Sequence, residues 1–132
     1  MEYMALVKRL DPHVEEEVTV EIEGVEFTGF AFICPYEIEV GQKYPVSIGF
    51  TILDEFKVRE IYENEKELER LDQGFGYCIR GLLDENSINA GIIILDEDEY
   101  FADYPDLIGK YVEMEVDRIS IEFLEKGIHE EL

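Results

Sequence analysis

Apolar and polar residues alternate on both sides of Glu23-Gly24, and the phase of the alternation reverses across this dipeptide. Successive side chains of a β-strand point to opposite faces, so a reversal at two residues that include a glycine is typical of a tight hairpin. A two-residue turn at this point places Ile22 opposite Val25 and Val20 opposite Phe27. The pattern therefore predicts two paired strands and the register between them.

Further strands are indicated on the C-terminal side of this hairpin. Residues 30–33 are apolar on both faces, so we expect this end of the second strand to lie deep in the core before Pro35 ends it. Residues 46–52 alternate again, and residues 56–58 continue the same parity, which fits one long bent strand or two strands joined by a short loop. Gly49 within this run predicts a bend or a bulge.

The second half of the chain reads as strands as well. Residues 77–83 form one predicted strand, and residues 92–95, apolar on both faces, form a predicted central strand. Apolar residues occupy even positions in 112–116 and odd positions in 119–123. One inserted residue at Asp117-Arg118 accounts for that slip, so we expect a β-bulge there.

One segment has a different pattern. From Asn64 to Leu71 the chain offers a capping residue, Glu67 at the capping-box position and leucines on one helical face, before Gly74. The pattern predicts a short helix. We therefore expect a mainly β fold, a small closed or partly open antiparallel barrel, OB-like or related, with one or two short helices.

The length of 132 residues fits one domain with one core. We expect a single barrel domain over residues 1–124 and an acidic C-terminal tail over residues 125–132.

Charge limits the classes of partner. The chain has 33 acidic and 11 basic residues, a formal charge of −22. Such a field repels phosphates, so we expect no direct binding of nucleic acid or of a membrane. The same field speeds encounter with a basic protein, although it also serves simply to keep a small domain soluble.

The two cysteines, Cys34 and Cys78, lie outside any metal-binding spacing, and two buried free thiols are favoured over one disulfide. The N-terminus lacks the features of a signal peptide, and no apolar run is long enough to span a membrane, so we expect a cytoplasmic protein.

No catalytic constellation stands out. Residues 84–91 resemble a calcium loop but lack its ligand spacing and its glycine, and Gly74-Phe75-Gly76 lacks the context of a phosphate loop. His13 and His129 fall in a predicted loop and in the predicted tail. We therefore expect no catalytic residue, no metal site and no cofactor, and regard the protein as non-enzymatic.

Residues 96–106 interleave six acids with three aromatic rings. Tyrosines supply contact area while carboxylates pair with Lys or Arg, the composition of a site for a basic partner. The predicted partner-binding residues are Asp96, Glu97, Asp98, Glu99, Tyr100, Asp103 and Tyr104. The rings also follow helical spacing, and the alternative is that they form the buried face of a one- or two-turn helix.

The leading hypothesis is a non-enzymatic acidic protein-binding module, in its sharpest form an immunity or inhibitor protein that presents carboxylates to a basic toxin or nuclease. The alternative is a β-barrel that binds a small ligand or a divalent cation. A third hypothesis is a hydrolase that uses a pair of carboxylates.

Overall fold

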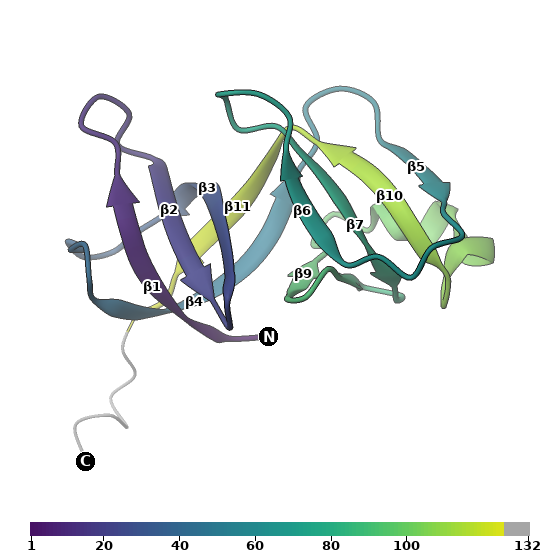
Figure 1. The fold of residues 1–132 in the computed structure, drawn as a ribbon, viewed down its shortest axis with the longest axis horizontal. Helices are drawn as coiled ribbons and strands as arrows, with labels where there is room; N and C mark the ends of the chain where they lie inside the picture. The colour runs from purple at the N-terminus through teal and green to yellow at the C-terminus, as the bar shows by residue number, and fades with distance from the viewer. Residues whose placement is uncertain (126–132) are drawn as a thin grey trace, which may run out of the picture.

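The computed structural model describes residues 1–125, which form a mainly β protein. The strands fall into two groups in space, with β1 to β3 on one side and β5 to β10 on the other, and the long strands β4 and β11 run between them (Figure 1). The strands are β1 Tyr3–Leu10, β2 Glu17–Ile22, β3 Val25–Ile33, β4 Lys43–Thr51, β5 Lys57–Glu60, β6 Glu67–Arg70, β7 Tyr77–Leu83, β8 Ser87–Asn89, β9 Ile93–Leu95, β10 Tyr111–Val116 and β11 Arg118–Phe123.

Five strands close a ring of backbone pairings. β1 pairs with β2, β2 with β3, β3 with β11, β11 with β4, and β4 with β1. All these pairs are antiparallel except β3 with β11. The predicted β2–β3 register is confirmed, with Ile22 opposite Val25 and Val20 opposite Phe27. Glu23 and Gly24 both have positive φ, 50° and 83°, as a type I′ hairpin turn requires.

The second group of strands is inserted between β4 and β11. Its centre is β7, which pairs with β10 along one edge and with β6 and β8 along the other. β10 also pairs with β5, and β8 pairs with β9. β9 returns to the ring through a parallel pairing between Leu95 and Gly49 of β4. The antiparallel arrangement expected from the sequence therefore includes two parallel pairs.

The strands β10 and β11 meet at Asp117, where the phase slip was predicted. β10 pairs with strands of the second group, whereas β11 pairs with β3 and β4 of the ring. The backbone N–H of Asp117 donates to the carbonyl of Thr51 (3.0 Å), and its carboxylate accepts from the N–H of Leu53 (2.6 Å). The extra residue lets one continuous segment change partners.

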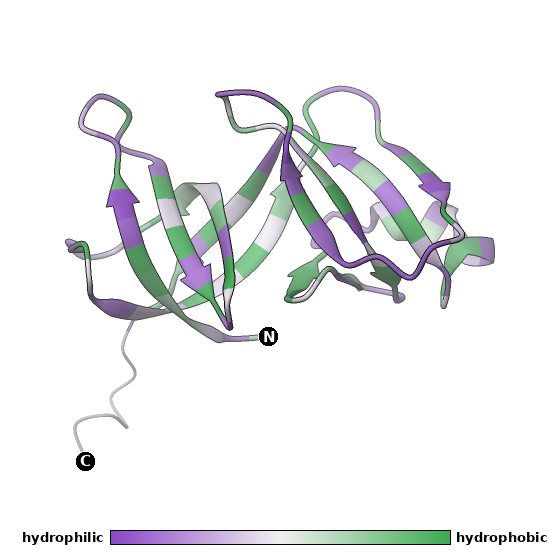
Figure 2. Cartoon of the chain, viewed as in Figure 1, coloured by the Kyte–Doolittle hydropathy of each residue, from purple (hydrophilic) through white to green (hydrophobic). Residues whose placement is uncertain are grey.

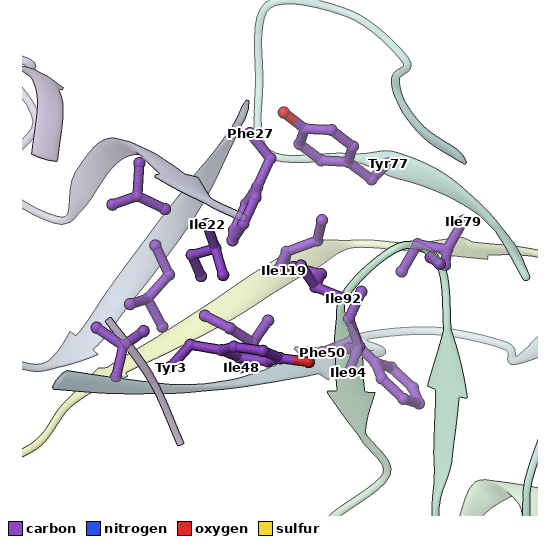
Figure 3. Close-up of a cluster of buried hydrophobic side chains, with 14 of the residues drawn as sticks. Tyr3, Ile22, Phe27, Ile48, Phe50, Tyr77, Ile79, Ile92, Ile94 and Ile119 are labelled. Atoms are coloured by element: carbon purple, nitrogen blue, oxygen red, sulfur yellow. The ribbon is translucent and has the colours of Figure 1, made fainter. Parts of the chain in front are cut away.

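One hydrophobic core joins the two groups. Green apolar residues alternate with purple polar ones along most strands (Figure 2). Ile22, Phe27 and Ile119 of the ring point toward Ile79 and Ile92 of the second group (Figure 3), and all five belong to one buried cluster. Burial of this shared apolar surface is the main force that holds the groups together.

Two tyrosine hydroxyls link the groups across this core. The hydroxyl of Tyr77 in β7 accepts a hydrogen bond from the backbone N–H of Thr28 in β3 (2.8 Å). The hydroxyl of Tyr3 in β1 accepts one from the N–H of Ile93 in β9 (2.7 Å). Each satisfies a backbone donor that would otherwise be unpaired at the junction.

The helix predicted from Asn64 to Leu71 is wrong. Residues 67–70 form β6, which pairs with residues 77–80 of β7. Leu68 packs against the core from this strand, while Leu71 is 46% exposed and pairs its N–H with the carbonyl of Gly76. Two leucines three residues apart were weak evidence for a helix, and the hairpin with β7 outweighs their helical propensity.

Other details of the strands also differ from the sequence predictions. The end of β3 does not lie in the core, because Phe32 and Ile33 are 47% and 42% exposed. The pairing of β4 with β11 runs through Gly49 without a shift of register, so there is no bulge at this glycine. Residues 46–58 form two strands, β4 and β5. The strands predicted at 77–83 and 92–95 are confirmed as β7 and β9, the second beginning at Ile93.

A row of charges crosses the outer face of the second group. Glu113 of β10 lies opposite Arg59 of β5 and Arg80 of β7, and Arg80 lies opposite Glu67 of β6. The Arg59–Glu113 and Arg80–Glu113 ion pairs measure 2.6 and 2.8 Å, and Arg80 reaches Glu67 at 3.0 Å. Burial alone would raise the pKa of Glu113, but hydrogen bonds from Arg80 and Arg59 outweigh burial and hold that pKa below its usual value.

The two buried glycines of β4 and β7 predict opposite responses to alanine. A Cβ on Gly81 would overlap the carbonyl oxygen of Asn89, whereas a Cβ on Gly49 would lie 3.5 Å from the carbonyl oxygen of Leu95. We expect Gly81→Ala to lower the free energy of unfolding by about 2 kcal/mol or more, and Gly49→Ala to change it by less than about 1 kcal/mol. Urea denaturation of both variants measures this difference, and equal effects would contradict it.

Glu113 also predicts a pH dependence. Because its pKa is lower in the folded than in the unfolded chain, its stabilisation is complete above the unfolded pKa, about 4.3, and is lost as the pH falls through the folded pKa. We expect Glu113→Gln to cost about 2 kcal/mol at pH 7. This deficit should shrink steadily below about pH 4.

The control is Glu115→Gln, which changes an exposed carboxylate on the same strand. Urea unfolding at a series of pH values measures both variants. A deficit that stays constant with pH for Glu113→Gln, or one of equal size for Glu115→Gln, would refute the assignment.

Candidate functional site

Asp96 starts the acidic segment but is itself buried, with 6% exposure. It follows β9 directly, and its carboxylate accepts hydrogen bonds from the backbone N–H groups of Tyr100 (3.0 Å) and Phe101 (2.7 Å). These bonds fold the intervening loop back on itself. The structure therefore gives Asp96 a structural position beneath the surface that the other predicted residues form.

The aromatic rings of the segment pack into the protein. Residues 100–103 and 105–107 form two 3-10 turns, so the alternative interpretation, a short helix with a buried aromatic face, is close to the structure. The ring of Phe101 is buried and stacks on Phe50 of β4 at 5.7 Å between centroids. Tyr100 and Tyr104 are half-buried against Phe56, at 5.3 and 5.6 Å. The tyrosines thus hold the loop in place and present only part of their surface.

The remaining carboxylates of the segment point outward. The side chains of Glu97, Asp98, Glu99 and Asp103 belong to exposed residues, and within residues 1–125 none of the four has an ion-pair partner. Glu99 has a left-handed backbone (φ 61°) that directs the chain into the first turn. Four unpaired carboxylates are therefore carried by a loop that Asp96 and the packed aromatic side chains hold in place.

Beside this loop lies a hollow of about 260 Å³ on the outer face of the ring, here named the Arg118 hollow. It is lined by Phe30 and Phe32 of β3, Ser47, Gly49, Phe50 and Thr51 of β4, Arg118 and Ser120 of β11, and Glu97 and Asp98 of the loop. Two consecutive strands, β3 and β4, supply the floor together with β11, which is far from them in sequence, and the acidic loop lies beside them.

Small side chains create this hollow. Gly49 and Ser120 lie opposite each other in the β4–β11 pair, and Ser120 lies opposite Phe30 in the β3–β11 pair. Their neighbours along the strands, such as Ile48 and Ile119, point inward and are fully buried. On the outward face, the small residues Gly49 and Ser120 therefore form the bottom of the hollow, and the larger side chain of Phe30 forms part of its edge. The hydroxyls of Thr51 and Ser120 bond to each other across the floor (2.8 Å).

Arg118 is the cation of the hollow. Its guanidinium carbon lies 4.0 Å from the centre of the Phe30 ring, a cation–π contact. Its Nε atom is buried and has no hydrogen-bond partner among the described residues. The other four arginines of the chain each pair with a glutamate. Within residues 1–125, Arg118 is thus the one arginine without a carboxylate partner, although the chain has three times as many acidic as basic residues.

Glu97 places negative charge close to the floor. A Cβ built on Gly49 would lie 3.8 Å from Oε1 of Glu97, so this carboxylate lies next to the floor at Gly49. Glu97 and Asp98 therefore face the same hollow as Arg118. Charges of both signs line one small space without pairing to each other.

Sequence reasoning found Glu97 and Asp98 but missed Arg118, Phe30 and the small residues of the floor. The alternation of residues 46–52 had already placed Ser47, Gly49 and Thr51 together on the face away from the core. That row of small and hydroxyl side chains was the one sequence signal for the floor of the hollow. The position of β11 between β3 and β4 could not be predicted, because local alternation does not show which strands pair when they are far apart in sequence.

Other reactive side chains are poorly placed for chemistry. Burial raises the pKa of the Cys78 thiol to about 11, so this thiol is protonated at neutral pH. Cys34, expected to be buried, is exposed, and its thiol donates to the carbonyl of Tyr36 (3.1 Å). Neither cysteine is in a disulfide. His13 is exposed, and His129 lies outside the described residues, as do residues 126–132 of the predicted tail.

Over residues 1–125, no group of three or more His, Cys, Asp or Glu side chains is arranged to hold a metal ion. The turn at Asp84-Glu85-Asn86 joins β7 to β8. None of the helical segments in the described chain has the length and apolar character needed to cross a bilayer.

The position of Asp96 predicts that stability and charge can be separated within the acidic loop. We expect Asp96→Ala to lower the free energy of unfolding by about 2 kcal/mol, because it leaves two backbone donors unpaired. The exposed neighbour Glu97→Ala should change it by less than about 0.5 kcal/mol. Urea denaturation and the near-ultraviolet circular dichroism of the tyrosines measure both effects. A stable Asp96→Ala protein with unchanged tyrosine signal would contradict this role.

No curated protein and no solved structure matches the chain significantly. Residues 1–124, which include every strand and every residue of the Arg118 hollow, match the family described as "Uncharacterised conserved protein UCP019853". The chain belongs to this family of uncharacterised conserved proteins.

Proposed function

We propose that this protein is a non-enzymatic binding module for a basic protein. The observation that carries the proposal is the loop of Glu97, Asp98, Glu99 and Asp103, whose exposed carboxylates have no cationic partner within residues 1–125. Exposed Lys and Arg side chains are available in the same molecule, yet they pair elsewhere or stay apart from this loop. A basic partner would supply the missing cations.

The way the loop is built supports a binding role. Ordering a mobile loop on association costs free energy, and a loop that is already fixed avoids that cost. Here Asp96 bonds two backbone N–H groups, and the ring of Phe101 is stacked on Phe50. The exposed ring of Phe32 beside the hollow adds apolar contact area of the kind that anchors interfaces.

The net charge favours association kinetics. A formal charge of −22 raises the local concentration of cationic molecules and steers them, with gains of about 10- to 1000-fold in association rate at low salt. The same field disfavours nucleic acid. An immunity or inhibitor protein for a basic toxin or nuclease is the sharpest form of this proposal, since its carboxylates occupy the place of substrate phosphates.

The layout of the ring is consistent with such a module. A closed ring of five strands resembles OB-type barrels, which bind extended ligands over the face of their second and third strands and the adjoining loops. In this protein β3 contributes Phe30 and Phe32 to the Arg118 hollow. Fold analogy alone does not assign function, and the proposal rests on the unpaired carboxylates.

The test compares two variants of equal net charge. Basic proteins captured from the source lysate on the immobilised chain are purified, and their association rates are measured at several salt concentrations. We expect the triple variant Glu97→Lys, Asp98→Lys and Glu99→Lys to reduce the association rate at least about 10-fold at low salt and to weaken its salt dependence.

The control reverses three exposed glutamates outside the loop, Glu2, Glu63 and Glu85, and should have a clearly smaller effect. Equal effects of the two triple variants would show that net charge alone acts. In that case, or if no basic protein is retained at low salt, the proposed site is refuted.

A further inference from the structure

The Arg118 hollow combines one unpaired cation with two unpaired anions in a space that a small molecule can fill. Arg118 stacks on Phe30, and Glu97 and Asp98 line the same hollow. Among residues 1–125, none of these three groups is in an ion pair. Native proteins rarely leave buried polar atoms unsatisfied, and the Nε of Arg118 is the one buried side-chain nitrogen or oxygen without a hydrogen-bond partner among the described residues.

The Arg118 side suits a carboxylate. A guanidinium presents a planar fork of N–H donors that matches the two oxygens of a carboxylate. The phenyl ring of Phe30 holds the fork in place, and Ser47 and Ser120 add hydroxyls to the same floor. Among residues 1–125, no carboxylate pairs with this guanidinium, so a carboxylate from outside can pair with it.

The carboxylates of Glu97 and Asp98 suit a cation. Glu97 and Asp98 are exposed carboxylates on a fixed loop, and Oε1 of Glu97 lies near the floor above Gly49. Ammonium or guanidinium groups pair with carboxylates through short charge-assisted hydrogen bonds. The arrangement therefore offers separate places for positive and for negative groups.

The charges exclude simpler ligands. A phosphate or another purely anionic molecule would meet two carboxylates in the hollow and the field of a protein with a formal charge of −22. A bare divalent cation would meet Arg118 and would find only two carboxylates, fewer oxygen ligands than calcium or magnesium takes. A ligand with one anionic and two cationic groups matches the three charges one to one.

The volume of the hollow limits the size of the ligand. The volume of about 260 Å³ is below the range of about 300–1000 Å³ typical of pockets for drug-sized molecules. It suits a molecule as small as an amino acid. The exposed ring of Phe32 at the rim offers an apolar surface for an aliphatic stem.

We propose that the Arg118 hollow binds a basic α-amino acid, arginine or lysine, whose carboxylate pairs with Arg118 and whose cationic groups pair with Glu97 and Asp98. The same carboxylate and side-chain cation occur at the end of a peptide whose last residue is Arg or Lys. This site goes beyond the proposed protein-binding function and does not require it, because it depends on the pairing of Arg118 with a carboxylate of the ligand, which the protein-binding proposal does not use.

The test is a titration of ¹⁵N-labelled full-length protein, followed by the amide signals of Ser47, Gly49 and Ser120. The probes are L-arginine, agmatine, which keeps the guanidinium but lacks the carboxylate, and L-leucine, which keeps the carboxylate but lacks the side-chain cation. We expect saturable shifts with arginine and an affinity at least about tenfold weaker for agmatine and for leucine, the loss of one charged pair.

Variants assign the two sides of the hollow. Arg118→Met should weaken arginine and leucine alike and bring arginine to the level of agmatine. Glu97→Gln should weaken arginine more than leucine, because leucine has only one cationic group to pair with Glu97 and Asp98. The matched control is Arg9→Met, which removes the same charge from an exposed ion pair with Glu26 and should bind arginine as the parent chain does. Unchanged amide shifts elsewhere in the spectrum establish that each variant is folded.

Two peptides ending in arginine, one with a free and one with an amidated carboxyl group, distinguish the sources. Binding of the free-acid peptide as tightly as arginine assigns the site to a chain end, and preference for the amino acid assigns it to the free molecule. The proposal is overturned if arginine gives no saturable shift, or if agmatine binds as well as arginine, since the carboxylate would then play no part. Both outcomes are independent of whether a basic protein partner is found.

Discussion

The passage of one chain segment through Asp117 is the constraint on which the rest of the structure depends. β10 belongs to the inserted group and β11 to the ring, and one residue separates them. Asp117 fixes this passage by bonding with the backbone of Thr51 and Leu53, just where β4 leaves the ring. Because both exits are tied together, the insertion is held at two adjacent points, and the shared core can form between the groups.

The candidate site follows from that constraint. β11 enters the ring between β3 and β4, so its outward residues Arg118 and Ser120 are set beside Phe30 and Gly49. The insertion then returns its acidic loop over the same face through the pairing of β9 with β4. Ring and insertion each supply one sign of charge, and neither alone would form the hollow.

Local patterning predicted what depends on near neighbours. The Glu23-Gly24 hairpin could be predicted from the alternation of apolar residues and the residues of the turn alone. The phase slip at Asp117 could be predicted from the change of apolar residues from even to odd positions. The helix expected at 64–71 failed because pairing with β7 decides that segment, and the exposure of Phe32 was missed because it depends on where β3 ends relative to β11. Glu97 could be read from composition, whereas Arg118 required knowledge of which strands lie side by side.

The place of β11 in the ring has a consequence for how the chain folds. β11 is the last strand in sequence that the structure describes, yet it lies between β3 and β4, so the ring cannot close until residues 118–123 have been synthesised and inserted. Contacts between segments about 70 to 90 residues apart have a large loop-closure entropy and slow the folding of β proteins. Until then the edges of β3 and β4 stay open, and we expect the nascent chain to be most prone to aggregation just before residues 118–123 leave the ribosome.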